Sequence, residues 1–199
     1  MKTVLFVASH LCSGSNELIS ALNENERIQI NTTKLVYEHP SVLDNLFSLG
    51  HKLDNSAAIY GSQLLYNTSL SCNAFYDFSK FIYVVTPAKP TLNRIKKERE
   101  EYNELSACRY YCFRLRRLYE MARRTPGAVF LTGDDLKNKH GSHLIDEYLD
   151  LKTPTDFSHL LIPEPETDDF DTLLLEEAQD SSEKYLYRFN RLDLKRYET

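Results

Sequence analysis

The sequence has no long hydrophobic run. Its opening apolar segment, TVLFVA, covers residues 3–8, which is too short for the core of a secretory signal or for a membrane-spanning helix. The chain also has no excess of positive charge. Its formal net charge is −5, which argues against a general nucleic-acid-binding protein. We therefore expect a cytoplasmic protein that binds neither membranes nor nucleic acids.

Paired cysteines are missing as well. The four cysteines show no C-x-x-C spacing and no cluster of histidines beside them: Cys12, Cys72, Cys108 and Cys112. Structural zinc sites need four such ligands at close spacing. The sequence therefore predicts no metal site and reduced thiols that are buried in the protein.

Three short apolar runs predict buried strands, at residues 2–8, 80–85 and 128–132. Between them lie helical patterns, the clearest at 15–22, 91–102 and 105–124. Buried strands that alternate with helices are typical of a parallel sheet with helices on both faces. The sequence thus predicts an α/β fold of three layers, in a chain of 199 residues that can bury a substantial core.

Weaker signals complete the prediction. Residues 28–37 suggest a second strand, residues 41–50 a short helix, and residues 57–67 a strand followed by a helical turn. Asp134 or Asp135 is expected to cap a helical segment, and Ser142 the helix after it.

The composition changes after residue 151. We therefore divide the chain into an α/β domain at 1–151 and a C-terminal part at 152–199, which begins with an acidic, proline-bearing loop and continues as two helices. The second helix carries Tyr185, Phe189 and Leu192 at helical spacing. This face is expected to pack on the domain or on a partner, which allows a homo-oligomer.

The segment Ser13-Gly14-Ser15-Asn16 joins the first strand to the first helix. A helix N-terminus presents unpaired backbone N–H groups and the positive end of the helix dipole, so it favours an anion. Gly14 allows close approach, and the hydroxyl and amide side chains add donors. The segment therefore suggests a phosphate-binding loop, although a tight turn without a ligand has the same pattern, and no G-x-x-x-x-G-K-[ST] motif occurs.

Three segments together resemble the sulfotransferases that use 3′-phosphoadenosine 5′-phosphosulfate (PAPS). Residues 6–18 are similar to the 5′-phosphosulfate loop of that family, residues 80–93 (KFIYVVTPAKPTLN) to its strand and helix that bind the 3′-phosphate, and residues 129–136 (VFLTGDDL) to its third landmark. The resemblance extends from Lys2 to about Leu151.

The resemblance implies a P-loop-like fold in which the three strong strands are neighbours and none lies at an edge. It also implies the transfer of a sulfuryl group from PAPS to a hydroxyl or amine of a small molecule or sugar, without a metal.

The chain departs from the family where the family has cations. Cys12 stands in place of a basic loop residue, Thr86 in place of an arginine, and Gly133 in place of a common tyrosine. Each lost charge-assisted hydrogen bond would weaken phosphate binding by ~1.5–3 kcal/mol. The expected substitutes are Lys89 and Asn93, to which Arg94 is adjacent, aided by an arginine of the long helix: Arg114 or Arg117. The arginines of that helix could equally form a solvated face that pairs with the acidic residues of the segment before it.

The resemblance also implies a general base on a loop beyond the first helix. Glu38 and His39 are the candidates, because they follow the second predicted strand at the carboxyl edge of the sheet. His51 is a rival, whereas His10 lies inside the loop and is expected to contact an anion.

Two alternatives stay open. One is a non-catalytic protein that keeps the sulfotransferase fold for binding or assembly, which the changes at Cys12 and Thr86 favour. The other is a different nucleotide-binding protein that uses the same loop.

Overall fold

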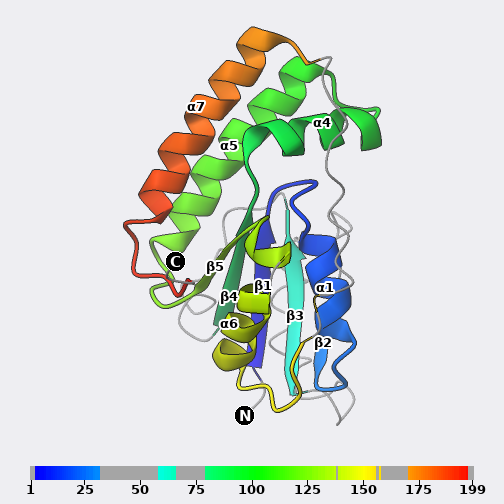
Figure 1. Cartoon of the computed structure of the whole chain (residues 1–199), viewed down its shortest axis with the longest axis vertical. Helices are drawn as coiled ribbons and strands as arrows, with labels where there is room; N and C mark the ends of the chain where they lie inside the picture. Colours follow the sequence, from blue (N-terminus) through cyan, green and yellow to red (C-terminus); the bar gives the residue numbers. More distant parts are fainter. Residues whose placement is uncertain are drawn as a thin grey trace, which may run out of the picture.

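Five parallel strands form one sheet in the order β2-β3-β1-β4-β5 (Figure 1). The computed structural model describes residues 3–31, 58–65, 79–137, 139–155, 157 and 170–196. The strands are β1 (Thr3–Ser9), β2 (Ile28–Asn31), β3 (Ile59–Leu64), β4 (Ser79–Val85) and β5 (Val129–Thr132).

The predicted α/β fold with a parallel sheet is confirmed, and the three strong strands β1, β4 and β5 are neighbours. The implied interior position is wrong for β5, which is the outermost of the five strands on its side. Its outer side is nevertheless partly paired, because the backbone N–H of Phe130 donates to the carbonyl of Lys195, and the N–H of Lys195 donates to Ala128.

Five α-helices and one 3-10 turn accompany the strands in the described residues. They are α1 (Ser15–Asn23), α4 (Ala88–Glu98), α5 (Glu104–Ala122), the 3-10 turn η2 (Asp135–Lys137), α6 (Lys139–Leu149) and α7 (Thr172–Phe189). Two expectations are wrong. Ser142 does not cap α6, which begins three residues earlier, and the two helices expected in the C-terminal part are replaced, over the described residues 170–196, by the single continuous helix α7.

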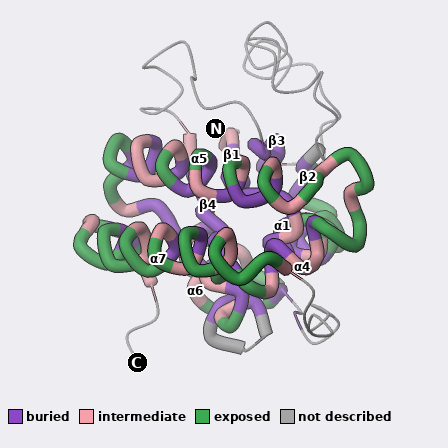
Figure 2. The backbone as a smooth tube through the Cα atoms, turned by 90° about the horizontal axis from the view of Figure 1, so that it is seen from above, coloured by how far each residue is buried: buried purple, intermediate pink, exposed green. Residues whose placement is uncertain are grey.

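Alternation along the strands divides the core into two halves. Leu5 and Val7 of β1 pack with α1 and α6, whereas Phe6 and Ala8 pack with α4, α5 and α7. Successive side chains of a strand point to opposite faces, so a strand with buried residues on both faces must be covered twice. Seen from above, the outer faces of α5 and α7 are the exposed ones (Figure 2).

The C-terminal helix is docked on the rest of the chain. The ring of Phe189 is fully buried and stacks on Phe130 at 4.8 Å between centroids, and it also meets Tyr119 of α5 edge-on. The predicted apolar face of this helix therefore packs on the α/β domain. Of the expected acidic loop, residues 158–169 lie outside the described part.

The strand order determines where the sheet can bind a ligand. The chain leaves β1 through α1 toward β2, and it leaves β4 through α4 and α5 toward β5, on the opposite face. The two connections therefore diverge between β1 and β4, and such a point is where open α/β sheets form a crevice at the carboxyl ends of the strands.

Several expectations cannot be compared with the structure. The continuation of the second strand to residue 37, the helix at 41–50 and the candidate bases Glu38, His39 and His51 lie outside the described residues. Among the helices that are described, none has the length and apolarity to cross a membrane.

Candidate functional site at the β1–α1 loop

The loop after β1 turns sharply into α1. Cys12 and Gly14 both have left-handed backbone conformations, with φ of 57° and 86°. Gly14 adopts this conformation without steric cost because it has no Cβ atom, whereas the backbone of Cys12 is strained in it. Gly14 is also the N-cap residue of α1, and no side chain caps the helix there.

The missing cap leaves backbone donors at the helix start. The first bond of α1 runs from the N–H of Leu18 to the carbonyl of Gly14. The N–H groups of residues 14–17 donate to no acceptor in the described part of the chain. These groups lie at the point where the β1 and β4 connections diverge, so the arrangement can hold an anion.

The side chains of the loop are turned inward. The hydroxyls of Ser9 and Ser13 donate to Ser15 Oγ at 2.8 and 3.2 Å. Gln63, in β3, donates through Nε2 to Ser15 Oγ at 2.8 Å and to Asn16 Oδ1 at 2.7 Å. The side chains of Ser13, Ser15 and Asn16 thus help to shape the loop, with Ser15 and Asn16 as acceptors, and the backbone N–H groups of residues 14–17 stay available as donors.

Thr86 closes the gap between β4 and the loop. Its backbone N–H donates to His10 Nε2 at 2.9 Å, and its hydroxyl donates to the carbonyl of Ser13 at 2.9 Å. His10 is fully buried, with Nδ1 2.9 Å from the carbonyl of Leu11. Burial lowers the pKa of His10 to about 4, so at neutral pH the ring is uncharged, donating through Nδ1 and accepting through Nε2.

Thr86 and Gly133, two positions at which the sequence departs from the sulfotransferase pattern, lie close together. A Cβ atom on Gly133 would lie 3.2 Å from Cγ2 and 3.3 Å from Oγ1 of Thr86, closer than ordinary van der Waals contact. The lack of a side chain at position 133 therefore accommodates the threonine at position 86. The carboxylate of Asp135 accepts from the N–H and hydroxyl of Thr132 at 2.7 Å each.

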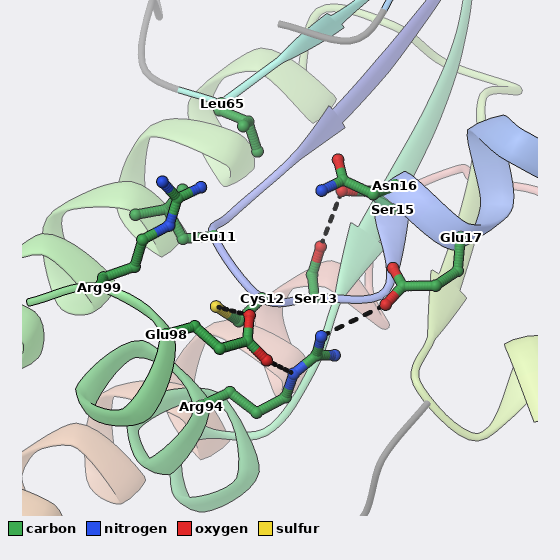
Figure 3. A pocket seen from close by; sticks show the side chains of 10 residues that line it. All are labelled: Leu11, Cys12, Ser13, Ser15, Asn16, Glu17, Leu65, Arg94, Glu98 and Arg99. Atoms are coloured by element: carbon green, nitrogen blue, oxygen red, sulfur yellow. Dashed lines mark hydrogen bonds and ion pairs between the residues drawn. The ribbon is translucent and has the colours of Figure 1, made fainter. Parts of the chain in front are cut away.

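A small pocket lies between the loop and α4 (Figure 3). Its cations come from α4 and the residue after it: Arg94 and Arg99. Arg94 donates through Nη2 to Glu17 of α1 at 3.3 Å and through Nε to Glu98 at 3.1 Å. The thiol of Cys12 donates to the other oxygen of Glu98 at 3.6 Å.

The protonation states follow from this cluster. Burial, reinforced by the charge of Glu98, raises the pKa of the Cys12 thiol to about 12, so Cys12 is a neutral donor and no thiolate. Burial works against the charge of Arg94, but the hydrogen bond and charge of Glu98 and the charge of Glu17 raise its pKa above the usual value. The pocket therefore holds a permanent cation beside the helix N-terminus.

The two arginines of α5 that were expected to replace the missing cations lie in different surroundings. Arg114 is fully buried; it donates through Nε to the carbonyl of Ser9 at 2.8 Å and through Nη2 to that of Leu64. It thus joins the ends of β1 and β3, which is a structural role. Arg117 pairs with Glu120 at 3.0 Å and lies over the ring of Phe113, away from these loop contacts.

Lys89 and Asn93 both lie on α4. Lys89 is exposed in the first turn, and Asn93, one turn further on, is partly buried. The Nδ2 atom of Asn93 is buried and makes no hydrogen bond, so an acceptor is missing there.

Sequence reasoning did not identify Gln63 as part of the site, and it noted Arg94 only as the neighbour of Asn93, without its cluster with Glu17 and Glu98. The i, i+4 spacing of Arg94 and Glu98 is visible in the sequence and indicates a helical ion pair. Nothing in the sequence indicates that Arg94 reaches Glu17, 77 residues away along the chain, because this contact depends on where α4 lies over the sheet.

A comparison with protein-family models finds no match for the chain. A search of curated proteins likewise finds no relative with significant sequence similarity.

Proposed function

We propose that the protein binds the 5′-phosphate side of a PAPS-type nucleotide at the β1–α1 loop and acts as a sulfotransferase with a P-loop-like fold. The observation that carries the proposal is the set of unpaired N–H groups at residues 14–17. They converge at the divergence point of the sheet, where α/β folds bind nucleotides. The landmarks at residues 80–93 and 129–136 support the same assignment.

The residues fit one end of this co-substrate better than the other. Backbone N–H groups and Arg94 suit a 5′-phosphate, since a guanidinium and N–H donors both match phosphate oxygens. At the end of β4, Thr86 supplies no cation, and its hydroxyl is already engaged by the loop. Lys89 and Asn93 are therefore the proposed partners of a 3′-phosphate.

PAPS supplies an activated sulfuryl group: its bond to the bridging oxygen of the nucleotide breaks while a bond to the acceptor oxygen or nitrogen forms. The protein has to position the acceptor in line, to stabilise charge on the departing phosphate and to take up the proton of the acceptor. The N–H groups of the loop and Arg94 would do the second task. Glu38 and His39 stay the proposed bases, and the acceptor is proposed to be a small molecule or sugar.

A second candidate function is binding without catalysis. It is favoured by the neutral thiol at position 12, because the residue beside the leaving oxygen then carries no charge. The edge position of β5 also departs from what the family resemblance implies. A protein of this kind would retain the nucleotide or its product as a ligand and transfer nothing.

Thermal unfolding in the presence of nucleotides tests the proposal. A ligand that binds only the native state stabilises it by mass action, by about 2.7 kcal/mol at a concentration of 100 Kd, and therefore raises the melting temperature. We expect 3′-phosphoadenosine 5′-phosphate to raise it more than AMP or ATP at equal concentration. A larger effect of ATP would favour the other nucleotide-binding alternative, and no effect of any nucleotide would contradict the proposal.

Catalysis needs a separate measurement. Incubation with labelled PAPS and a panel of alcohols, amines and sugars should yield a labelled acceptor, and Glu38→Gln or His39→Gln should lower kcat while leaving the binding of the bisphosphate unchanged. Binding of the bisphosphate without turnover on any acceptor would support the non-catalytic candidate.

A further inference from the structure

The loop carries no charged basic residue, and two arginines from α4 and the residue after it, Arg94 and Arg99, line the pocket beside it. Arg99 is 40 % exposed and pairs with Glu101, so Arg94 is the more enclosed of the two. Arg94 of α4 has only 12 % of its side chain exposed, and its guanidinium lies between α1 and α4 (Figure 3). Two of its three nitrogens are engaged: Nε with Glu98 and Nη2 with Glu17. The third, Nη1, is buried and has no hydrogen-bond partner.

A buried donor without a partner costs free energy, more so in a charged group, and native structures rarely leave one unexplained. The orphaned Nη1 belongs to a side chain that lines the pocket together with Ser13, Ser15 and Asn16. An acceptor placed against the helix N-terminus would therefore have both N–H groups and a guanidinium within the same pocket. Phosphate is such an acceptor, because its oxygens match the forked donors of arginine.

The two carboxylates hold Arg94 with different strength. Glu98 is fixed from both sides, by Arg94 on one oxygen and by the Cys12 thiol on the other. Among the described residues Glu17 contacts Arg94 alone, at 3.3 Å. Glu17 is consequently the partner that an incoming anion can replace, whereas Glu98 keeps the guanidinium in place.

We infer that Arg94 is the phosphate-recognition cation of this site, and that a bound phosphate displaces Glu17 from it. This inference rests on the proposed function. In this inference Arg94 of α4, 82 positions further along the chain, supplies the charge that the loop lacks at Cys12. Arg94 is also assigned to the 5′ side of a nucleotide, because Glu17 stands in the first turn of α1.

Binding of 3′-phosphoadenosine 5′-phosphate and of AMP to the full chain, measured by titration calorimetry, tests the inference. Arg94→Gln should weaken both ligands by about tenfold or more, the loss expected for one charge-assisted hydrogen bond, and by the same factor for each. Arg94→Lys should recover part of the loss, because the charge returns without the fork.

The chain offers a matched control. Arg116 and Glu120 form an i, i+4 pair with the same Nε–Oε1 distance of 3.1 Å as Arg94 and Glu98, but on the exposed side of α5. Arg116→Gln should leave both affinities unchanged. Melting temperatures measured without ligand separate an effect on folding from an effect on binding.

Glu17→Gln distinguishes displacement from simple charge repulsion. Freed from Glu17, Arg94 should bind phosphate about two- to fivefold more tightly, because the phosphate no longer has to displace a carboxylate that is held by one contact of 3.3 Å. In the Arg94→Gln background this gain should vanish, whereas a gain from repulsion alone would persist. Glu24→Gln at the other end of α1 serves as the control.

The outcomes separate the two proposals. If the unmodified protein binds neither nucleotide, the proposed function fails and this inference with it. If it binds them and Arg94→Gln binds equally well, the inference alone is wrong. A loss confined to the bisphosphate would place Arg94 at the 3′-phosphate and would also overturn it.

Discussion

Arg114 should be among the most sensitive positions for stability. It is 1 % exposed and donates to the last carbonyl groups of β1 and β3, those of Ser9 and Leu64. Hydrogen bonds from a charged donor contribute about 1.5–3 kcal/mol each, and a buried carbonyl left unpaired costs a similar amount. We expect Arg114→Met, which keeps most of the volume, to lower the free energy of unfolding by about 3 kcal/mol or more.

Urea unfolding at constant pH, followed by circular dichroism, gives this free energy directly. In a chain of this size a loss of 3 kcal/mol corresponds to a decrease of about 6–12 °C in melting temperature. Arg116→Met on the same helix is the control, because its guanidinium is exposed and should matter by less than about 0.5 kcal/mol. A loss below about 1 kcal/mol for Arg114→Met would show that the two carbonyls do not depend on this side chain.

Three further predictions concern the loop and its neighbours. His10→Gln should flatten the dependence of stability on pH, because the pKa of His10 falls from 6.5 to about 4 on folding. The stability that this shift contributes is complete above pH 6.5 and is lost as the pH falls from 6.5 to about 4, by about 3 kcal/mol in total. Equal slopes in urea titrations of both proteins between pH 4 and 7 would contradict this. Gly133→Ala should lower stability by about 1 kcal/mol. Adding Thr86→Ser to this variant removes the crowding methyl group but keeps the hydroxyl, and it should recover part of that loss. Additive losses in thermal unfolding would exclude a direct contact. Cys12→Lys should strengthen the binding of 3′-phosphoadenosine 5′-phosphate, measured by calorimetry, because it adds a cation at the loop. The gain is limited because the new lysine also pairs with Glu98. An unchanged affinity would argue that the loop does not bind phosphate.

The elements that could be predicted from the sequence are those with a local cause. β1, β4 and β5 are continuous apolar runs, and α1, α4 and α5 carry apolar faces at helical spacing, so their place in the chain was predicted to within a few residues. At two places the local sequence pattern led to a wrong prediction. The cap-like Ser142 stands inside α6, which begins three residues earlier. The polar stretch in the middle of α7 does not interrupt the helix: Asp180, Glu183 and Lys184 are exposed, whereas the buried Ser182 lies 3.0 Å from the hydroxyl of Tyr111.

The loop itself was also within reach of the sequence. A strand, a short segment of small residues and a helix place unpaired N–H groups together whatever the rest of the chain does, because these groups belong to the first turn of the helix. The sequence alone therefore determined that a helix with unpaired N–H groups begins at the end of a buried strand.

The tertiary structure decided which charges accompany that site. Of the expected substitutes, Arg114 binds two strand ends from inside the core, and Arg117 lies on the outer side of α5. The guanidinium beside the loop belongs to Arg94, which pairs with Glu17 across 77 positions of sequence. Helical periodicity specifies which side chains share a face, but the crossing of α4 over the carboxyl edge depends on the packing of α4, α5 and α7 together, and only that packing brings the cation to the loop.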